Sequence, residues 1–202
     1  MNDILKAMID QTQTMLVVMI GPPGSGKTTL AKHISVNTVT PIVSSDEVRR
    51  ELFGNEDDQG DPEKVFSIVY ESIGKCAMKG IDVIYDATNC DKVYRKDLLD
   101  CFREYFDVIV GVCYDWTLER CLEWNEIRDR VVPDWVIKNM YAAYTDEHDK
   151  PSLDEGFDNL ITFTEAWDIF NLLKDGDINA QTFRHRRDLQ LQVESDGLDI
   201  EG

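Results

Sequence analysis

One eight-residue stretch, GPPGSGKT at positions 21–28, constrains the fold of this chain more than any other feature. It follows a continuous apolar run at residues 15–20, which is typical of a strand buried on both faces of a parallel sheet. Residues 27–34 then have the pattern of a helix. The pattern G-x-x-x-x-G-K-[ST] has physical meaning only when a strand precedes it and a helix follows it. We therefore expect an α/β domain in which this glycine-rich turn joins the first strand to a helix.

The alternation of strands and helices continues along the chain. We predict further strands at residues 41–44, 81–85, 108–114 and 159–164, and helices at residues 46–53, 62–79, 92–106, 117–124, 133–147 and 167–173. Such alternation predicts a mainly parallel, five-stranded sheet flanked by helices. Ser44 or Ser45 can cap the helix at residues 46–53. We expect a single domain over residues 1–175, with a helical lid at about residues 124–148, and a C-terminal tail at residues 176–202 that is mobile or docks elsewhere.

Composition limits the classes of partner. The 202 residues include 21 Lys and Arg against 39 Asp and Glu, a net charge of −18. A body this acidic repels polyanions, which excludes non-specific coating of nucleic acid or anionic lipid but allows a local pocket for one phosphate or one strand end. The five scattered cysteines contain no C-x-x-C pair, which favours reduced thiols in a cytoplasmic protein over a zinc site. We see no membrane span and no export signal.

The turn at residues 21–28 is predicted to bind a nucleoside triphosphate. Its glycines let backbone N–H groups point inward onto phosphate oxygens, and the helix N-terminus adds partial positive charge. Lys27 is expected to reach the β- and γ-phosphates, and the Thr28 hydroxyl to ligate Mg²⁺. ATP is the expected donor, because no guanine-specifying N-K-x-D pattern occurs. The predicted nucleotide-binding residues of this turn are Gly21, Gly24, Ser25, Gly26, Lys27, Thr28 and Thr29.

A second group of residues indicates an acceptor site. Asp46 and Arg49 are three residues apart at a predicted helix start, so they share one helix face. Asp46 could orient an attacking hydroxyl and accept its proton, while Arg49 could hold a phosphate on the acceptor. The alternative is a capping aspartate and a surface salt bridge.

Two further segments carry candidate site residues. Asp86 ends an apolar strand, where it could hold Mg²⁺ through water or hydrogen-bond the phosphate loop. Asn89 and Arg95 shape the acceptor pocket or cap the next helix. Arg128 and Arg130 lie on a connector between helices, which suits a lid that neutralises charge on the γ-phosphoryl group. A solvated charged loop is the alternative for these two arginines.

The ordered motifs resemble those of the polynucleotide 5′-hydroxyl kinase family of P-loop phosphotransferases. They are GPPGSGKTTLA, SSDEVRRELFG, DATN with Arg95 after it, RDR-VVP-DWVI and EGFD, spread over about residues 16–163. The resemblance implies a P-loop kinase sheet with a helical lid, and binding of ATP and Mg²⁺ by Lys27 and Thr28. It makes Asp46 the general base and Arg49 the ligand of the acceptor's 3′-phosphate.

For the lid, the resemblance implies that Arg128 is the main arginine, or Arg130 if the alignment is shifted. The chain departs from the family where Trp124 and Asn125 replace an Arg-Asn pair that many members carry. Many members are also fused to a phosphatase, phosphodiesterase or ligase domain. This chain is too short for one, so the resemblance implies a separate phosphatase or ligase partner for end repair.

We expect an ATP-dependent kinase that acts on a hydroxyl of a nucleic acid, most simply the 5′ end of DNA or RNA, with a short footprint because of the acidic body. Three alternatives stay open. The first is a phage-like kinase for a hydroxymethylated pyrimidine base within DNA, which would need an aromatic pocket for a flipped base. The others are a kinase for a nucleoside or sugar, and a nucleotide-switched binding protein without transfer. The aromatic residues available for a base pocket are Trp116, Trp124, Trp135, Tyr141 and Tyr144.

Overall fold

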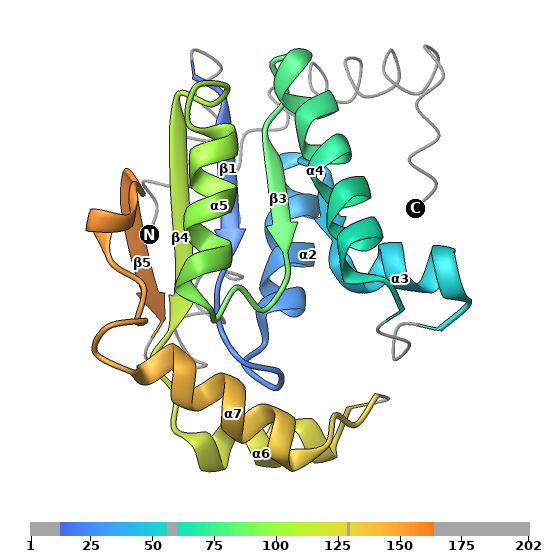
Figure 1. Cartoon of the computed structure of the whole chain (residues 1–202), viewed down its shortest axis with the longest axis vertical. Helices are drawn as coiled ribbons and strands as arrows, with labels where there is room; N and C mark the ends of the chain where they lie inside the picture. Colours follow the sequence, from blue (N-terminus) through green and yellow to red (C-terminus); the bar gives the residue numbers. More distant parts are fainter. Residues whose placement is uncertain (1–12, 56–59, 129, 164–202) are drawn as a thin grey trace.

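The computed structural model describes residues 13–55, 60–128 and 130–163. Five strands form one sheet in the order β2-β3-β1-β4-β5, and all four neighbouring pairs are parallel (Figure 1). This confirms the predicted fold class. The strands are β1 (Met15–Met19), β2 (Ile42–Ser44), β3 (Val83–Asp86), β4 (Val108–Tyr114) and β5 (Asn159–Phe163).

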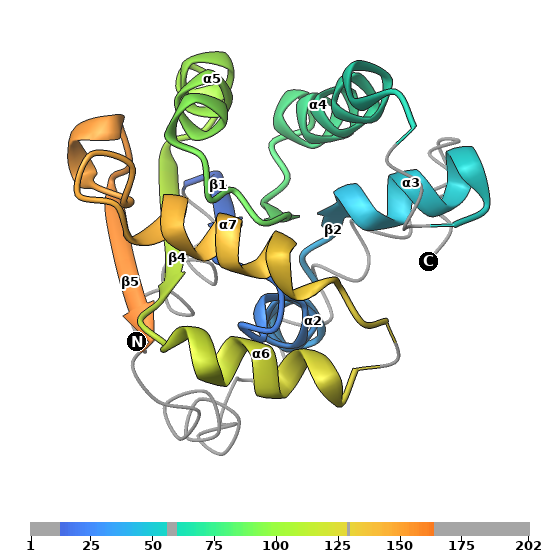
Figure 2. The same ribbon diagram turned by 60° about the horizontal axis from the view of Figure 1, so that its bottom comes forward.

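Helices cover both faces of the sheet. Val65 of α4 and Leu98 of α5 lie in one buried apolar cluster, and Leu30 of α2 and Cys121 of α6 lie in another, so the two helix pairs pack on opposite faces (Figure 2). Helices α6 and α7, which are called the lid from here on, overlap the predicted lid range 124–148 and lie beyond the end of the sheet at which the glycine-rich turn begins (Figure 1). The helices are α2 (Lys27–Thr38), α3 (Ser45–Phe53), α4 (Pro62–Met78), α5 (Lys92–Phe102), α6 (Leu118–Glu126) and α7 (Asp134–Thr145), with a 3-10 turn η1 (Leu153–Glu155).

Strand β1 explains why the first apolar run has no polar alternation. All five of its residues are buried. Leu16 and Val18 belong to the cluster with α4 and α5, whereas Val17 and Met19 belong to the cluster with α2 and α6. A central parallel strand is covered on both faces, so every position must be apolar.

The parallel arrangement brings the candidate site segments to one edge. In the strand register, Met19 pairs with Asp86 and Asp86 pairs with Ser44, so β1, β3 and β2 end side by side. The glycine-rich turn follows β1, helix α3 follows β2 directly, and the lid follows β4. Ser44 is the residue that caps α3, because its hydroxyl accepts from the Glu47 N–H at 3.4 Å.

Two helix ends lie about four residues from the sequence-based prediction, and the other ends lie within about two residues of it. Helix α2 continues beyond residue 34 to Thr38, whose side chain is buried and whose hydroxyl donates to the Ile34 carbonyl at 2.8 Å. Helix α5 ends at Phe102 rather than near residue 106, because the Arg103 guanidinium binds the carbonyls of Phe106 and Asp107 as the chain turns toward β4.

Part of the sequence-based prediction lies outside the described residues: the helix at residues 167–173, the tail at 176–202 and the first 12 residues of the domain. Within the ranges that the structure describes, every helix is too short or too polar to cross a membrane.

Candidate functional site

The glycine-rich turn is tightly folded against the lid. Gly24 and Gly26 have φ angles of 81° and 83°, a region that only glycine enters freely. A Cβ atom on Gly24 would lie 2.1 Å from the Cys121 carbonyl oxygen of α6, whereas one on Gly26 would make only ordinary contact with Trp116 and Trp124. The turn therefore needs glycine for its backbone shape and for its contact with α6.

Lys27 lies inside this turn. It is buried, and its Nζ donates to the Pro22 carbonyl at 2.9 Å and to the Ser25 hydroxyl at 3.4 Å. Burial lowers the pKa of Lys27, while the charges of Asp86 and Asp46 oppose that shift. A phosphate oxygen in the turn could replace the Pro22 carbonyl as the acceptor and compensate for the lost hydration.

Asp86 and Thr28 meet beside Lys27. Asp86 is buried at the end of β3, and its carboxylate makes a side-chain hydrogen bond with Thr28. Burial raises the pKa of Asp86, and both this hydrogen bond and the charge of Lys27 partly offset the effect. A carboxylate next to a hydroxyl is the oxygen donor set that Mg²⁺ prefers, so these two residues fit the predicted metal site.

Asp46 lies at the start of α3 and is half exposed. One of its oxygens accepts from Arg49 Nη1 at 3.3 Å, and the other accepts from Arg130 Nη1 at 2.8 Å. Its charge raises the pKa of both Lys27 and Asp86, so it acts on the same electrostatic site. The structure thus brings Asp46, Arg49 and the glycine-rich turn together.

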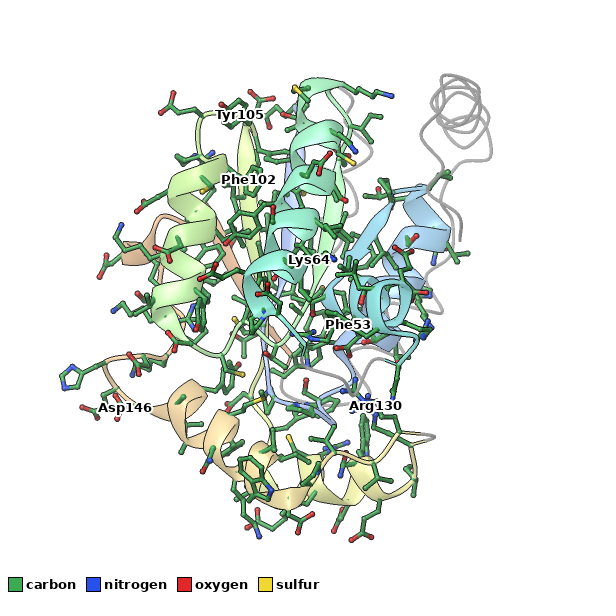
Figure 3. All side chains as sticks on the ribbon, turned by 45° about the vertical axis from the view of Figure 1, so that its right-hand side comes forward. Phe53, Lys64, Phe102, Tyr105, Arg130 and Asp146 are labelled. Atoms are coloured by element: carbon green, nitrogen blue, oxygen red, sulfur yellow. The ribbon has the colours of Figure 1, made fainter. Side chains whose placement is uncertain are left out.

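The two lid arginines lie near different residues of the site: Arg130 near Asp46, and Arg128 near Lys27. Arg130, labelled in Figure 3, reaches across 84 residues of sequence to Asp46. Arg128 is close enough to Lys27 for its charge to help lower the pKa of that lysine. The sequence indicated that both arginines serve a lid, but it held no signal for the contact with Asp46.

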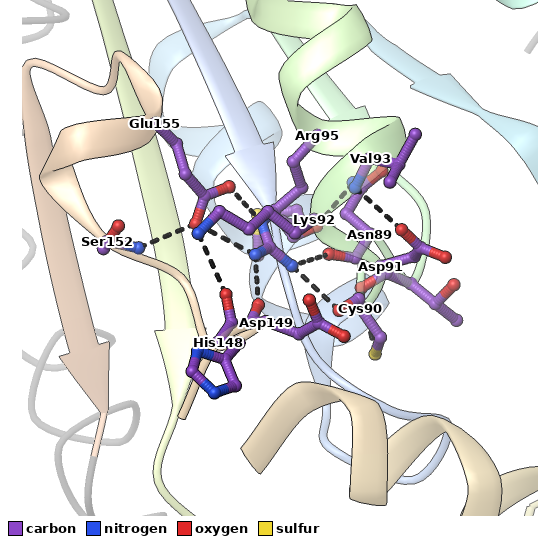
Figure 4. Close-up of polar contacts among 12 residues, drawn as sticks. Asn89, Cys90, Asp91, Lys92, Val93, Arg95, His148, Asp149, Ser152 and Glu155 are labelled. Carbon is purple, nitrogen blue, oxygen red and sulfur yellow. Dashed lines mark hydrogen bonds and ion pairs between the residues drawn. The ribbon is translucent and has the colours of Figure 1, made fainter. Parts of the chain in front are cut away.

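Asn89 and Arg95 have internal partners. The Asn89 amide donates to the Met19 carbonyl at 2.8 Å, just before the glycine-rich turn, and Asn89 has a φ of 47°. The side chain of Arg95 is fully buried and binds Glu155 through Nε at 2.7 Å and Nη2 at 2.9 Å. Its other N–H groups bind the carbonyls of Asn89, Cys90 and Asp149 (Figure 4). All five guanidinium donors therefore bind protein groups. In this conformation Arg95 holds the backbone next to the site in place and has no donor left for an acceptor substrate.

Sequence reasoning missed one side chain beside the turn. Arg120 lies over the rings of Trp116 and Trp124, with its Cζ 4.8 and 5.0 Å from their centroids. The two rings are 4.5 Å apart between centroids. The tryptophans were visible as candidate base contacts, and Arg120 sits one helical turn before Trp124, which was the only available signal.

Of the other aromatic candidates, Tyr144 has a structural role. It is buried, and its hydroxyl donates to the Tyr114 carbonyl at 2.8 Å and accepts from the Tyr114 N–H at 2.9 Å. These bonds fix α7 to the end of β4. Trp135, by contrast, is 67% exposed on α7.

The parallel sheet, the glycine-rich turn after β1 and the helical lid together define a P-loop kinase fold. The chain belongs to the AAA domain family AAA_33, whose model matches residues 16–146. The same architecture occurs in the gluconokinase from Sinorhizobium meliloti 1021, with 15% identity, 87% of this chain and 95% of that chain covered, and a TM-score of 0.51. It also occurs in the shikimate kinase from Bacteroides thetaiotaomicron, with 14% identity, coverage of 81% and 96%, and a TM-score of 0.54.

A more similar sequence is found in the structure of the Pnkp1/Rnl/Hen1 RNA repair complex. The identity is 26% and the TM-score is 0.60, over 69% of this chain and 48% of that chain. The present chain thus spans about half the length of the chain that it matches in that complex.

Proposed function

We propose that this protein transfers the γ-phosphate of ATP to a hydroxyl of a nucleic acid, most simply the 5′-hydroxyl of a DNA or RNA strand. The observation that carries the proposal is the placement of Asp46 and Arg49 at the same sheet edge as the phosphate-binding turn. A carboxylate there can orient an alcohol, and a cation three residues later can hold the neighbouring phosphate of the strand.

Each residue then has a defined task. The turn and Lys27 hold the transferred phosphoryl group, and Asp46 orients the hydroxyl and takes its proton late in the transfer. Arg128 and Arg130 stabilise the charge that develops on the phosphoryl oxygens. Thr28 and Asp86 would hold Mg²⁺, which when bound neutralises phosphate charge.

The likeness to the RNA repair complex supports a strand end as the acceptor, since its sequence identity is higher than that of the small-molecule kinases. In that structure, Pnkp1 is part of a complex with Rnl and Hen1. By analogy, we propose that a separate phosphatase or ligase partner completes end repair around the present chain.

A panel of acceptors tests the proposal. We would incubate the protein with γ-labelled ATP, Mg²⁺ and, separately, a 5′-hydroxyl DNA strand, a 5′-hydroxyl RNA strand, end-blocked DNA with hydroxymethyl pyrimidines, a nucleoside and a sugar. We expect label on the 5′-hydroxyl strands. Label confined to the end-blocked DNA would assign a base-directed kinase instead, and label only on the nucleoside or sugar would contradict a nucleic-acid acceptor.

A further inference from the structure

We infer that Phe66 and Tyr94 form a stacking platform for the terminal base of the acceptor strand. This inference rests on the proposed function, and it assigns the acceptor-binding surface that the phosphate-binding turn and Asp46 leave unspecified. Phe66 lies near the start of α4 and Tyr94 near the start of α5. Both helices begin at the sheet edge that carries the site (Figure 1).

A continuous row of contacts leads from Asp46 to this platform. Arg49 Nη1 is 3.3 Å from the Asp46 carboxylate, and the guanidinium carbon of Arg49 is 6.0 Å from the centroid of the Phe66 ring. The ring of Tyr94 stacks on that of Phe66, with centroids 6.3 Å apart and planes 15° apart. A carboxylate, a cation and two nearly parallel rings therefore follow one another from the site outward.

The two rings are not needed for the core. Neither belongs to the buried apolar clusters, and Tyr94 is 61% exposed although it is a large aromatic residue. Leu98 and Leu99, further along α5, supply the buried contacts of that helix. The exposed Tyr94 ring, stacked on the half-buried Phe66 ring, is therefore available to a flat ligand.

The neighbouring cation indicates which ligand this is. The Arg49 side chain is 11% exposed, and its Nε has no hydrogen-bond partner among the residues that the structure describes. A strand end offers both a phosphate for this arginine and a base for the rings, whereas a free sugar or nucleoside offers no phosphate. Stacking also suits a chain of net charge −18, because it binds a strand without many phosphate contacts.

The test compares strands with and without a terminal base. We would measure kcat and KM of the full chain for a 5′-hydroxyl oligonucleotide and for the same oligonucleotide with an abasic 5′ residue. For the wild type we expect a KM roughly tenfold lower for the strand that carries the base. The variant Tyr94→Leu and the double variant with Phe66→Leu should raise that KM toward the abasic value, with little change in the KM for ATP.

Two controls separate stacking from folding. Tyr94→Phe keeps the ring and should keep the wild-type KM. Tyr105→Leu removes a tyrosine that is 59% exposed beyond the far end of α5, and it should behave as the wild type (Figure 3). The single variant Tyr94→Leu changes a mostly exposed residue, so it keeps the test valid if the double variant fails to fold.

The outcomes distinguish the inference from the proposed function. If Tyr94→Leu phosphorylates strand ends with the wild-type KM and the wild-type dependence on the terminal base, base stacking on Phe66 and Tyr94 is contradicted. The assignment as a kinase of strand ends is then unaffected. If the wild type phosphorylates small alcohols but no strand, the proposed function is contradicted, and the stacking inference is contradicted with it because it requires a strand as acceptor.

Discussion

Lys27 and Asp86 are oppositely charged residues that are both buried at the end of the central strands. Burial lowers the pKa of Lys27 and raises the pKa of Asp86, and each charge partly restores the ionised form of the other. Bound phosphate would add negative charge at Lys27, which favours the protonated lysine.

This predicts that ATP binding takes up protons at alkaline pH. Between the lowered pKa of Lys27 in the free protein and the higher pKa in the complex, the complex binds more protons than the free protein. ATP affinity should therefore fall as the pH rises through that window. Calorimetric titrations in two buffers of different ionisation enthalpy measure the uptake, and identical heats in both buffers would contradict it.

The phosphate-binding turn and helix α6 form one structural unit. Gly24 is in van der Waals contact with the backbone of Cys121, which leaves no space for a side chain, and it also has a positive φ. Gly54, at the C-terminal end of α3, has a similar φ of 73°, but a Cβ atom there would meet no heavy atom within 4 Å among the described residues.

These two glycines allow a matched comparison. Gly54→Ala should cost only the backbone term, about 1–2 kcal/mol of unfolding free energy, and leave ATP binding intact. Gly24→Ala should cost more and weaken ATP binding strongly, because the loop or α6 must move. Urea unfolding and an ATP titration measure both effects, and equal losses in the two variants would refute the role given to the α6 contact.

Local patterns predicted most elements, because a strand buried on both faces and a helix with one apolar face leave periodic traces in the sequence. They could not predict contacts that depend on tertiary packing. Arg130 meets Asp46 and Arg95 meets Glu155 across 84 and 60 positions, and no local signal marks either pair. For Phe66, the sequence predicted only that it lies in the helix at residues 62–79. Nothing in the sequence indicated that the Tyr94 ring stacks on it. The extension of α2 to Thr38 also runs against the modest helix propensity of its last residues, so packing decides it.

In the whole molecule, the buried Arg95–Glu155 pair joins the segment after β3 to the segment after the lid. Breaking one side of such a pair leaves an uncompensated buried charge. Arg95→Met should therefore lower the unfolding free energy by about 3–5 kcal/mol in urea. Lys96→Met, which removes the exposed partner of Asp100 on the same helix, should cost less than about 1 kcal/mol. Similar losses for both variants would mean that the Arg95 network does not stabilise the fold.

The net charge of −18 is also a property of the whole molecule, and it limits how the protein can bind a nucleic-acid strand. We predict a short footprint of a few nucleotides at one end, so the logarithm of the binding constant should depend only weakly on the logarithm of the salt concentration. Fluorescence anisotropy of a labelled oligonucleotide over a salt series measures this slope. A steep slope, indicating the release of many counterions, would contradict the short footprint.

The central claim is that Asp46 acts on an alcohol placed next to the terminal phosphate of ATP. Its most direct test is the rate of label transfer from γ-labelled ATP to a 5′-hydroxyl oligonucleotide, with both substrates saturating, for the wild type, Asp46→Asn and Glu47→Gln. Glu47 is the matched control, because it neighbours Asp46 on α3 and pairs with Arg50 at the surface. We predict that Asp46→Asn loses roughly 10²–10⁴-fold in rate and keeps its ATP affinity, while Glu47→Gln stays near the wild-type rate. Transfer by Asp46→Asn at the wild-type rate would contradict the claim.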